Sequence, residues 1–372
     1  MIALNSPTTV EKAVSSTKFE EIYQHSVVRK LTVILVLSVS LVLIALVATA
    51  IGVAGITVHD VASVILGKIM PGLQLLTTSD LAEIIVIEFR LPRIFLAMLA
   101  GFSLAGAGAV KQSVLRNPLV SPFTLGISAG ASLGAAIAIV LGKSVLGSSY
   151  LVAGKYLIVF NAFLFGMITM LLIYGIAKVK GAVPETLILA GVALGYLFQA
   201  GVSALKYFSD NDALKDLVVW LMGGFWGANW DAVVILLPIV SLCLILLSRF
   251  TWDLNALGAG EEVAVSLGVN VDRLRLVTLV LATFMASSTI AFTGIIGFIG
   301  LVSPHVCRFV IGSDNRFLLP ASALTGAILL LLADTLARIV LAPVELPVGI
   351  LTSLIGAPFF LYLLLKKKRQ YW

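Results

Sequence analysis

The residues of this chain that could do chemistry are few, and their types and spacing do not assemble an active site. Asp334 and Arg338 stand four residues apart in an apolar run, where they could pair along one helix. His305 follows Pro304 in another apolar run, where a lone histidine is more often a packing residue than a proton relay. A carrier driven by a proton gradient needs a ladder of buried acids and histidines. The lack of such a ladder argues against a secondary transporter.

The sequence also lacks two motifs typical of enzymes that bind zinc or ATP. It contains no HExxH motif, and it contains no GxxxxGK[ST], so it has no P-loop to hold ATP. Cys243 and Cys307 each lie in an apolar run and are predicted to be small core residues rather than a disulfide or a metal pair. We therefore expect no cofactor or metal on this chain, and we expect any ATP and Mg to be bound by a separate ATPase subunit.

The composition indicates a membrane protein, and ten runs are long enough to cross. Hydrophobic residues make up 60% of the chain, charged residues 12%, and the mean hydropathy is +1.09. A span needs roughly 20 apolar residues. We predict an all-α, polytopic fold with one transmembrane domain over residues 31–369. The candidate spans are residues 31–53, 93–113, 122–142, 155–177, 185–206, 232–250, 276–294, 297–312, 318–338 and 347–365.

The distribution of positive charge predicts the orientation. The net charge of +6 is spread over the ends of the spans, which is a topology signal rather than a nucleic-acid surface. Most of the 25 lysines and arginines fall on the side of the N-terminus. Both termini are therefore predicted to be cytosolic in a multi-pass protein of the cytoplasmic membrane. Residues 1–30 are predicted to be a disordered cytosolic tail, because they are polar and the run that follows is too long for a signal peptide.

Residues 252–275 form the only long polar stretch between two strongly apolar runs. They are predicted to form two short cytosolic helices broken by Gly260 and Gly268, with the acidic pair Glu261 and Glu262 at the front of the second. A compact helical knob on one face of a membrane protein is typical of a contact for a soluble partner. In an importer that partner would be an ATPase. An ordinary solvated loop is the alternative.

On the opposite side, arginines stand where the charge bias disfavours them. Arg90 and Arg93 flank Leu91-Pro92 just before the second span, and Arg338 ends the ninth. Guanidinium groups suit the capture of carboxylates on a docking protein, and anchoring in lipid headgroups is the alternative. Elsewhere the spans carry glycines at short spacing, which favours close helix packing. These are Gly126, Gly130, Gly134, Gly191, Gly195, Gly294, Gly297 and Gly300.

Several blocks in order carry a resemblance to a known family. They include RLPRIFLAMLAGFSLAGAGAVKQSVLRNPLVSPFTLGISAG, LGAGEEVAVSLGVNVDRLR, GIIGFIGLVSPHVCRF and ELPVGILTSLIGAPFF. The chain resembles the FecCD-type permeases over roughly residues 31 to 369. These are the membrane subunits of binding-protein-dependent ABC importers for ferric siderophores, haem and vitamin B12.

The resemblance implies a homodimer of ten-helix subunits, two ATPase subunits below it and one extracytoplasmic binding protein above. It also implies roles for particular residues. The resemblance assigns coupling to the ATPase to residues about 256–270, and it assigns docking of the binding protein to the three arginines. The inherited positions are Gly260, Glu261, Glu262, Leu267 and Gly268 for coupling, Arg90, Arg93 and Arg338 for docking, and Asn117, Pro118 and Leu119 for a cytosolic gate.

One departure from the family pattern lies at the inner end of the fifth span, where relatives often carry small hydroxyl residues. This chain has Pro184 and Glu185 there, and we assign that pair no gate role. The expected cargo is a metal chelate, most often a ferric siderophore in this family, with cobalamin and haem as alternatives. A gradient-driven carrier and a receptor or scaffold without transport are the alternatives from other classes.

Overall fold

The computed structural model describes residues 9–52, 57–69, 80–142, 154–179, 181 and 183–365, and this part of the chain is helical with no strand. Seven helices in it are long and apolar enough to cross a membrane, and three shorter apolar helices complete the predicted ten. The long spans lie in α1 (Thr9–Ala50), α4 (Leu91–Val114), α7 (Lys155–Lys178), α8 (Pro184–Phe208), α10 (Trp230–Ser248), α13 (Val271–Thr293) and α15 (Asn315–Ile339). The shorter ones are α5 (Ile127–Leu141), α14 (Ile299–Ile311) and α16 (Val348–Leu365).

The remaining helices are short and lie between the spans. α3 (Asp80–Ile84) and the π-helix η1 (Ile85–Arg90) extend α4 at its start. α2 (Val58–Ile69), α9 (Asn211–Met222), α11 (Thr251–Ala259) and α12 (Glu261–Ser266) are connectors. The sequence predicted the last two but neither α2 nor α9, because both are only 12 residues long and mix apolar with charged positions.

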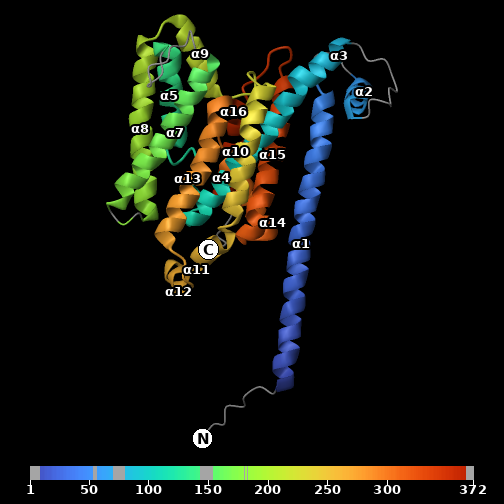
Figure 1. Ribbon diagram of the computed structural model, residues 1–372, viewed down its shortest axis with the longest axis vertical. Helices are drawn as coiled ribbons and strands as arrows, with labels where there is room; N and C mark the ends of the chain where they lie inside the picture. The colour runs from blue at the N-terminus through green and yellow to red at the C-terminus, as the bar shows by residue number, and fades with distance from the viewer. Residues whose placement is uncertain are drawn as a thin grey trace.

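The N-terminal polar segment differs from its prediction. α1 already begins at Thr9 and continues without a break to Ala50, so residues 9–30 are helical rather than a disordered tail. In Figure 1, α1 runs beside the bundle and its N-terminal half projects below it. The polar stretch thus continues the helix of the first span instead of ending before it.

Side chains at the loop ends explain where several helices begin. In α9, α10, α13 and α15 the residue before the helix is Asp or Asn, and its side-chain oxygen accepts a hydrogen bond from a backbone N–H in the first turn. Such N-caps satisfy donors that the helix cannot satisfy itself. The four N-cap residues are Asp210, Asn229, Asn270 and Asp314.

Small residues bring the central helices into backbone contact. α4 packs against α13, α14 and α15, and a Cβ atom at Gly108 would lie 1.9 Å from the carbonyl oxygen of Gly300. A Cβ at Gly134 would lie 2.3 Å from the carbonyl oxygen of Asn161 in α7. A Cβ atom at Gly126 would likewise overlap the carbonyl oxygen of Gly191, so the backbones of α5 and α8 are in close contact there. The packing role predicted for Gly126, Gly134, Gly191 and Gly300 is confirmed, whereas Gly108 was not singled out from the sequence.

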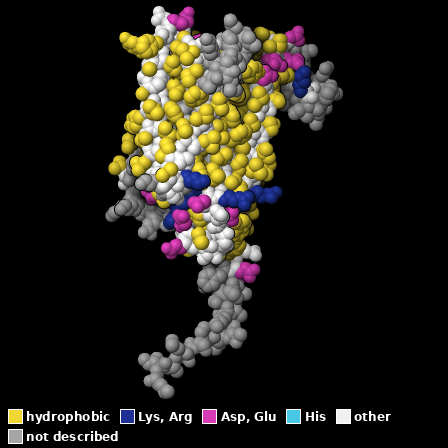
Figure 2. Space-filling view, turned by 60° about the vertical axis from the view of Figure 1, so that its left-hand side comes forward, with side chains coloured by type: hydrophobic (Ala, Val, Ile, Leu, Met, Phe, Trp, Pro, Cys, Tyr) yellow, Lys and Arg dark blue, Asp and Glu magenta, His cyan; other side chains and the backbone are white. Residues whose placement is uncertain are grey.

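The surface has the pattern expected of a membrane protein. Figure 2 shows apolar side chains over the middle of the bundle, whereas acidic and basic side chains gather towards its two ends. Figure 1 places α11 and α12 at the lower end, the end from which the N-terminal half of α1 projects. The end that carries α2, α3 and α9 is opposite.

Candidate functional site

The predicted knob between the sixth and seventh spans consists of α11 and α12. Gly260 separates the two helices with φ 136° and ψ 150°, and Gly268 follows α12 with φ 85°. Residues with a Cβ atom rarely adopt either conformation, so the two glycines permit the sharp turns. The prediction of two short helices broken at these positions is confirmed.

The structure separates the two acidic residues of the knob. Glu261 Oε2 lies 2.6 Å from Nη2 of Arg275, and Arg275 is buried in α13. This pair fixes the start of α12 to α13. Glu262 is exposed, and no ion pair in the described part of the chain includes it. The sequence suggested one acidic pair with one role, whereas Glu261 pairs with Arg275 while 51% of its side chain stays exposed, and Glu262 is exposed without such a pair.

The knob also presents large apolar side chains at the polar end of the molecule. Leu267 is 68% exposed, Val265 60% and Trp252 64%. Exposed apolar side chains outside the lipid-facing belt are typical of a protein contact. Leu267 was among the predicted coupling residues, whereas Val265 and Trp252 were missed. In the sequence, the recurrence of apolar residues at Val263, Val265 and Leu267 within the polar stretch was the signal that could have indicated an apolar surface on the knob.

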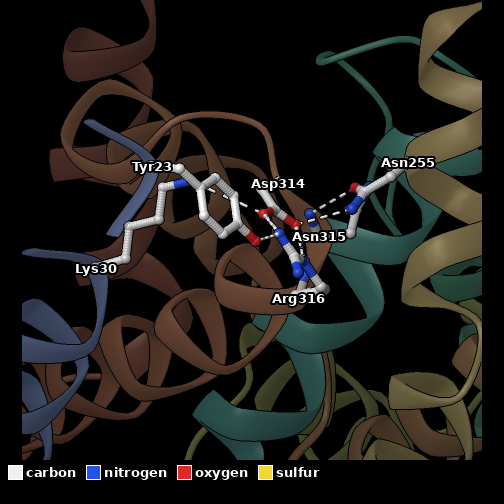
Figure 3. A network of polar contacts seen from close by, with 6 residues as sticks. All are labelled: Tyr23, Lys30, Asn255, Asp314, Asn315 and Arg316. Carbon is white, nitrogen blue, oxygen red and sulfur yellow. Dashed lines mark hydrogen bonds and ion pairs between the residues drawn. The ribbon is translucent and has the colours of Figure 1, made fainter. Parts of the chain in front are cut away.

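A polar network joins the knob to two spans at the same end (Figure 3). Asp314, the N-cap of α15, accepts a hydrogen bond from Asn255 Nδ2 in α11 at 2.8 Å and pairs with Arg316 at 2.6 Å. From α1, Lys30 Nζ lies 3.8 Å from Asp314, and Tyr23 Oη accepts a hydrogen bond from Arg316 at 3.3 Å. Asp314 is thus the centre of a contact between α1, α11 and α15.

The next residue extends this network to α4. Asn315 donates from its backbone and side chain to Oδ1 of Asn255, at 2.8 and 3.0 Å, and accepts a hydrogen bond from Ser113 at 2.6 Å. Partial burial raises the pKa of Asp314, but the hydrogen bonds from Arg316 and Asn255 outweigh it and hold that pKa below its ordinary value. Sequence reasoning missed the network because its members lie far apart in the chain.

At the opposite end, two of the three predicted docking arginines, Arg93 and Arg338, flank one buried carboxylate. Asp334, which has no exposed side-chain surface, lies 2.9 Å from Nη2 of Arg93 and 3.2 Å from Nε of Arg338. The predicted pairing of Asp334 with Arg338 along one helix is confirmed, although this contact lacks hydrogen-bond geometry. Arg93 also pairs with Glu345 at 2.8 Å.

Arg90 and Arg338 cap the last turn of α1. Arg90 Nη1 donates to the carbonyl oxygens of Thr49 and Ala50 at 2.7 and 3.1 Å. Arg338 donates to those of Ala48 and Ile51, at 3.3 and 3.2 Å. A helix leaves its last four carbonyl groups unsatisfied, and these guanidinium groups supply the missing donors. Both arginines are only 6% exposed, so their groups are committed to this chain. Their docking role stays a prediction.

The predicted gate lies in the turn after α4, next to a cavity. Asn117 Oδ1 accepts a hydrogen bond from the backbone N–H of Leu119 at 2.9 Å, which fixes the turn around Pro118. Leu119 is partly exposed and lines a cavity of about 980 Å³. The gate role itself stays a prediction. Pro184 occupies the first position of α8, with Glu185 in its first turn, and neither lines this cavity.

The cavity lies beside α16 and is almost entirely apolar. Its walls come from residues 119–124, the end of α9, the segment 295–301 and α16. Ser121, Thr124 and Ser353 supply its side-chain hydroxyl groups, and no charged residue is among the described residues that line it. Phe298 lines it with φ 65°, a strained conformation for a residue with a side chain. Sequence reasoning missed Phe298, and only the glycines around it hinted at an unusual turn.

The structure also bears on metal binding. Among the described residues, no group of three or more His, Cys, Asp or Glu side chains could hold a metal ion. Cys243 and Cys307 are free and buried. Their predicted role as core residues is confirmed.

The comparisons with known proteins now identify the family. A profile of the FecCD transport family matches residues 37–366. The chain belongs to the FecCD transport family. It is a multi-pass membrane permease of that family, and the resemblance drawn from its sequence blocks is confirmed.

Relatives with different cargoes are similar to nearly the same extent. The Fe(3+)-citrate import system permease protein YfmE of Bacillus subtilis is 40% identical over 92% of this chain and 97% of its own length. The hemin transport system permease protein HmuU of Yersinia pestis is 40% identical over 79% and 87%. The cobalamin import system permease protein BtuC of Halobacterium salinarum is 43% identical over 77% and 74%.

The fold is also similar to a solved structure. That structure is named for an inward-facing conformation of a metal-chelate type ABC transporter, and it superposes with a TM-score of 0.76 at 32% identity. The match covers 90% of this chain and 99% of the other.

Proposed function

We propose that this permease is the membrane subunit of an ATP-driven importer that moves a metal chelate, specifically a ferric siderophore, across the cytoplasmic membrane. It works as a homodimer by alternating access, with two ATPase subunits on the cytosolic side and an extracytoplasmic binding protein on the other. Hydrolysis of ATP takes place on the ATPase subunits, so this chain is not an enzyme. Both termini are cytosolic in this arrangement.

The observation that carries the proposal is the knob of α11 and α12. It combines exposed apolar side chains, Leu267 and Val265, with the free carboxylate of Glu262. Such a surface fits an apolar groove rimmed by basic side chains on a soluble protein. The chain has no P-loop of its own, so a partner that binds ATP explains both features.

The choice of cargo rests on the relatives and on the cavity. The compared permeases are named for Fe(3+)-citrate, hemin and cobalamin import, and all three cargoes are bulky metal chelates. The cavity is large and no charged side chain is among the described residues that line it, which suits a bulky cargo that must pass without being bound tightly. We favour a ferric siderophore, with cobalamin or haem as the alternative cargo.

For docking of the binding protein, Arg93 is the favoured residue of the three arginines. Its partner Glu345 keeps 35% of its side-chain surface exposed, so this ion pair can exchange with a carboxylate brought by another protein. Arg93→Lys keeps a positive charge beside buried Asp334 but loses the guanidinium fork, so it should reduce stimulation of ATP hydrolysis by the binding protein while basal hydrolysis survives. Unchanged docking affinity would contradict this assignment.

The function is tested by uptake of labelled ferric siderophore and, separately, labelled cobalamin in cells with and without this gene. Loss of iron uptake alone supports both the importer and the cargo. Loss of cobalamin uptake alone supports the importer and changes the cargo. If neither depends on the gene, haem is tested next. Collapsing the proton gradient while sparing ATP should leave uptake intact, whereas a gradient-driven carrier would stop.

A pair of substitutions tests the knob directly. Leu267→Ala removes an exposed apolar side chain and should weaken binding of the ATPase subunit about tenfold or more, as hot-spot truncations do. Val179→Ala is a matched control, because Val179 is exposed after α7 and outside the knob. Equal effects of the two changes would contradict a coupling role for α11 and α12.

A further inference from the structure

The N-terminal part of α1 is a helix that the family match does not include. The match begins at residue 37, whereas α1 begins at Thr9. Figure 1 shows this part of α1 extending below the level of α11 and α12, on the same end of the bundle. A subunit seated under the knob would therefore have this helix at its side.

This helix is fixed at its base rather than loosely attached. Within the bundle, Val33, Ile34 and Leu37 of α1 pack against a cluster in α14 and α15 that includes Cys307 and Leu318. The helix continues without a break from this packed segment to Thr9, so the packing sets the direction of the projecting part.

The same base is joined to the knob. Tyr23 and Lys30 reach the Asp314–Arg316 pair, and Asn255 of α11 binds Asp314 from the other side (Figure 3). The Arg316 guanidinium also lies over the ring of Trp252, 4.1 Å from its centroid, at the start of α11. Two contacts thus connect α11 to this polar network: the hydrogen bond from Asn255 to Asp314, and the contact of the Trp252 ring with Arg316. A displacement of α11 therefore acts on α1 through both.

Two exposed acidic side chains of α1 have the same charge as an exposed side chain of the knob. Glu20 and Glu21 of α1 are exposed, as is Glu262 of α12. Acidic side chains on both surfaces complement basic side chains on one partner. The Thr9–Lys30 segment as a whole holds four Lys or Arg and three Glu, so the charge complementarity rests on Glu20 and Glu21 alone.

We propose that the Thr9–Lys30 part of α1 is a second contact for the ATPase subunit that docks on α11 and α12. Asp314 fixes the position of this part of α1 relative to α11. The inference rests on the proposed function, because it needs that ATPase. Glu20 and Glu21 face basic side chains on the flank of the ATPase, and movement of the knob is transmitted to α1.

The first test is photocrosslinking in the assembled complex in nanodiscs. Both native cysteines are buried, so a benzophenone maleimide labels an introduced cysteine selectively. Gln24→Cys places the label on the exposed part of α1, and Glu88→Cys places it on exposed η1 at the opposite end as the control. We expect a crosslink to the ATPase subunit from Gln24→Cys and none from Glu88→Cys. A label at Gln24 that reaches only lipid or another permease overturns the inference.

The second test separates this inference from the proposed function. Glu20→Gln with Glu21→Gln should weaken ATPase binding about threefold at low salt and less at 0.5 M salt, because exposed charges are screened. If Leu267→Ala weakens binding but the glutamine variant binds normally at both salt levels, the second contact is wrong and the proposed function stands. If Leu267→Ala also binds normally, the coupling assignment itself fails.

Discussion

Replacing Asp334 with asparagine should destabilise the arginine cluster at the end of the bundle opposite α11 and α12. The Asp334 carboxylate has no exposed surface and lies between Arg93, at 2.9 Å, and Arg338, at 3.2 Å. Removing one member of a buried ion pair costs about 3–5 kcal/mol, because the remaining charge is left buried. Arg93 keeps Glu345 and Arg338 keeps the carbonyl groups of α1, so we expect about 3 kcal/mol.

The assay is unfolding by denaturant in detergent micelles, in which the midpoint should fall without a change in slope. Glu345→Gln is the matched control at the same cluster. Its carboxylate is 35% exposed, so its loss should cost less than about 1 kcal/mol. Equal losses for the two variants would refute the argument that burial makes Asp334 the central charge. Combining Asp334→Asn with Arg93→Gln should cost less than the two single losses added together, because the residues share one interaction.

Two further predictions concern packing and pH. Gly108→Ala should lower the free energy of unfolding by about 1–3 kcal/mol, because the new Cβ atom meets the carbonyl oxygen of Gly300. Gly175→Ala is the control, because a Cβ atom there has no other atom within 4 Å, and it should be neutral or stabilising by up to about 1 kcal/mol. Similar losses would contradict backbone contact as the cause. The folded pKa of Asp314 is lowered, so its contribution to stability is present above the ordinary carboxyl pKa of about 3.9 and is lost as the pH falls through the folded value. Asp314→Asn should flatten the fall of the denaturation midpoint below about pH 4, and an unchanged pH profile would show that this carboxylate does not contribute.

The ten spans could be predicted from the sequence because their signal is local. A run such as the one around Leu236 needs no knowledge of its neighbours to be recognised as apolar. The break at Gly260 is equally local, since the glycine stands between two helix-forming segments. α2 and α9 escaped prediction because each is too short to span a membrane and too mixed in composition to resemble one.

Apart from the pair of Asp334 and Arg338 on one helix, the partners of the charged residues could not be predicted, because they depend on tertiary contacts. Glu261 and Glu262 are neighbours of one type, yet only Glu261 is directed to Arg275 on the next helix. Arg90 stands in a motif that suggested a surface role, but the carbonyl groups that it binds belong to the end of α1, about forty residues earlier. Sequence patterns gave the positions of these charges, and only the fold gave their partners.

The backbone contacts of α4 bear on how motion in this permease can be measured. Gly101 of α4 lies against Ala327 of α15, and Gly108 against Gly300 of α14, with no side chain between them to change rotamer. The three helices therefore cannot slide past one another without atomic overlap, and they provide a fixed reference frame within the bundle. A distance label on α4 follows the whole frame, so its separation from a label on α16 reports the displacement of one cavity wall relative to that frame.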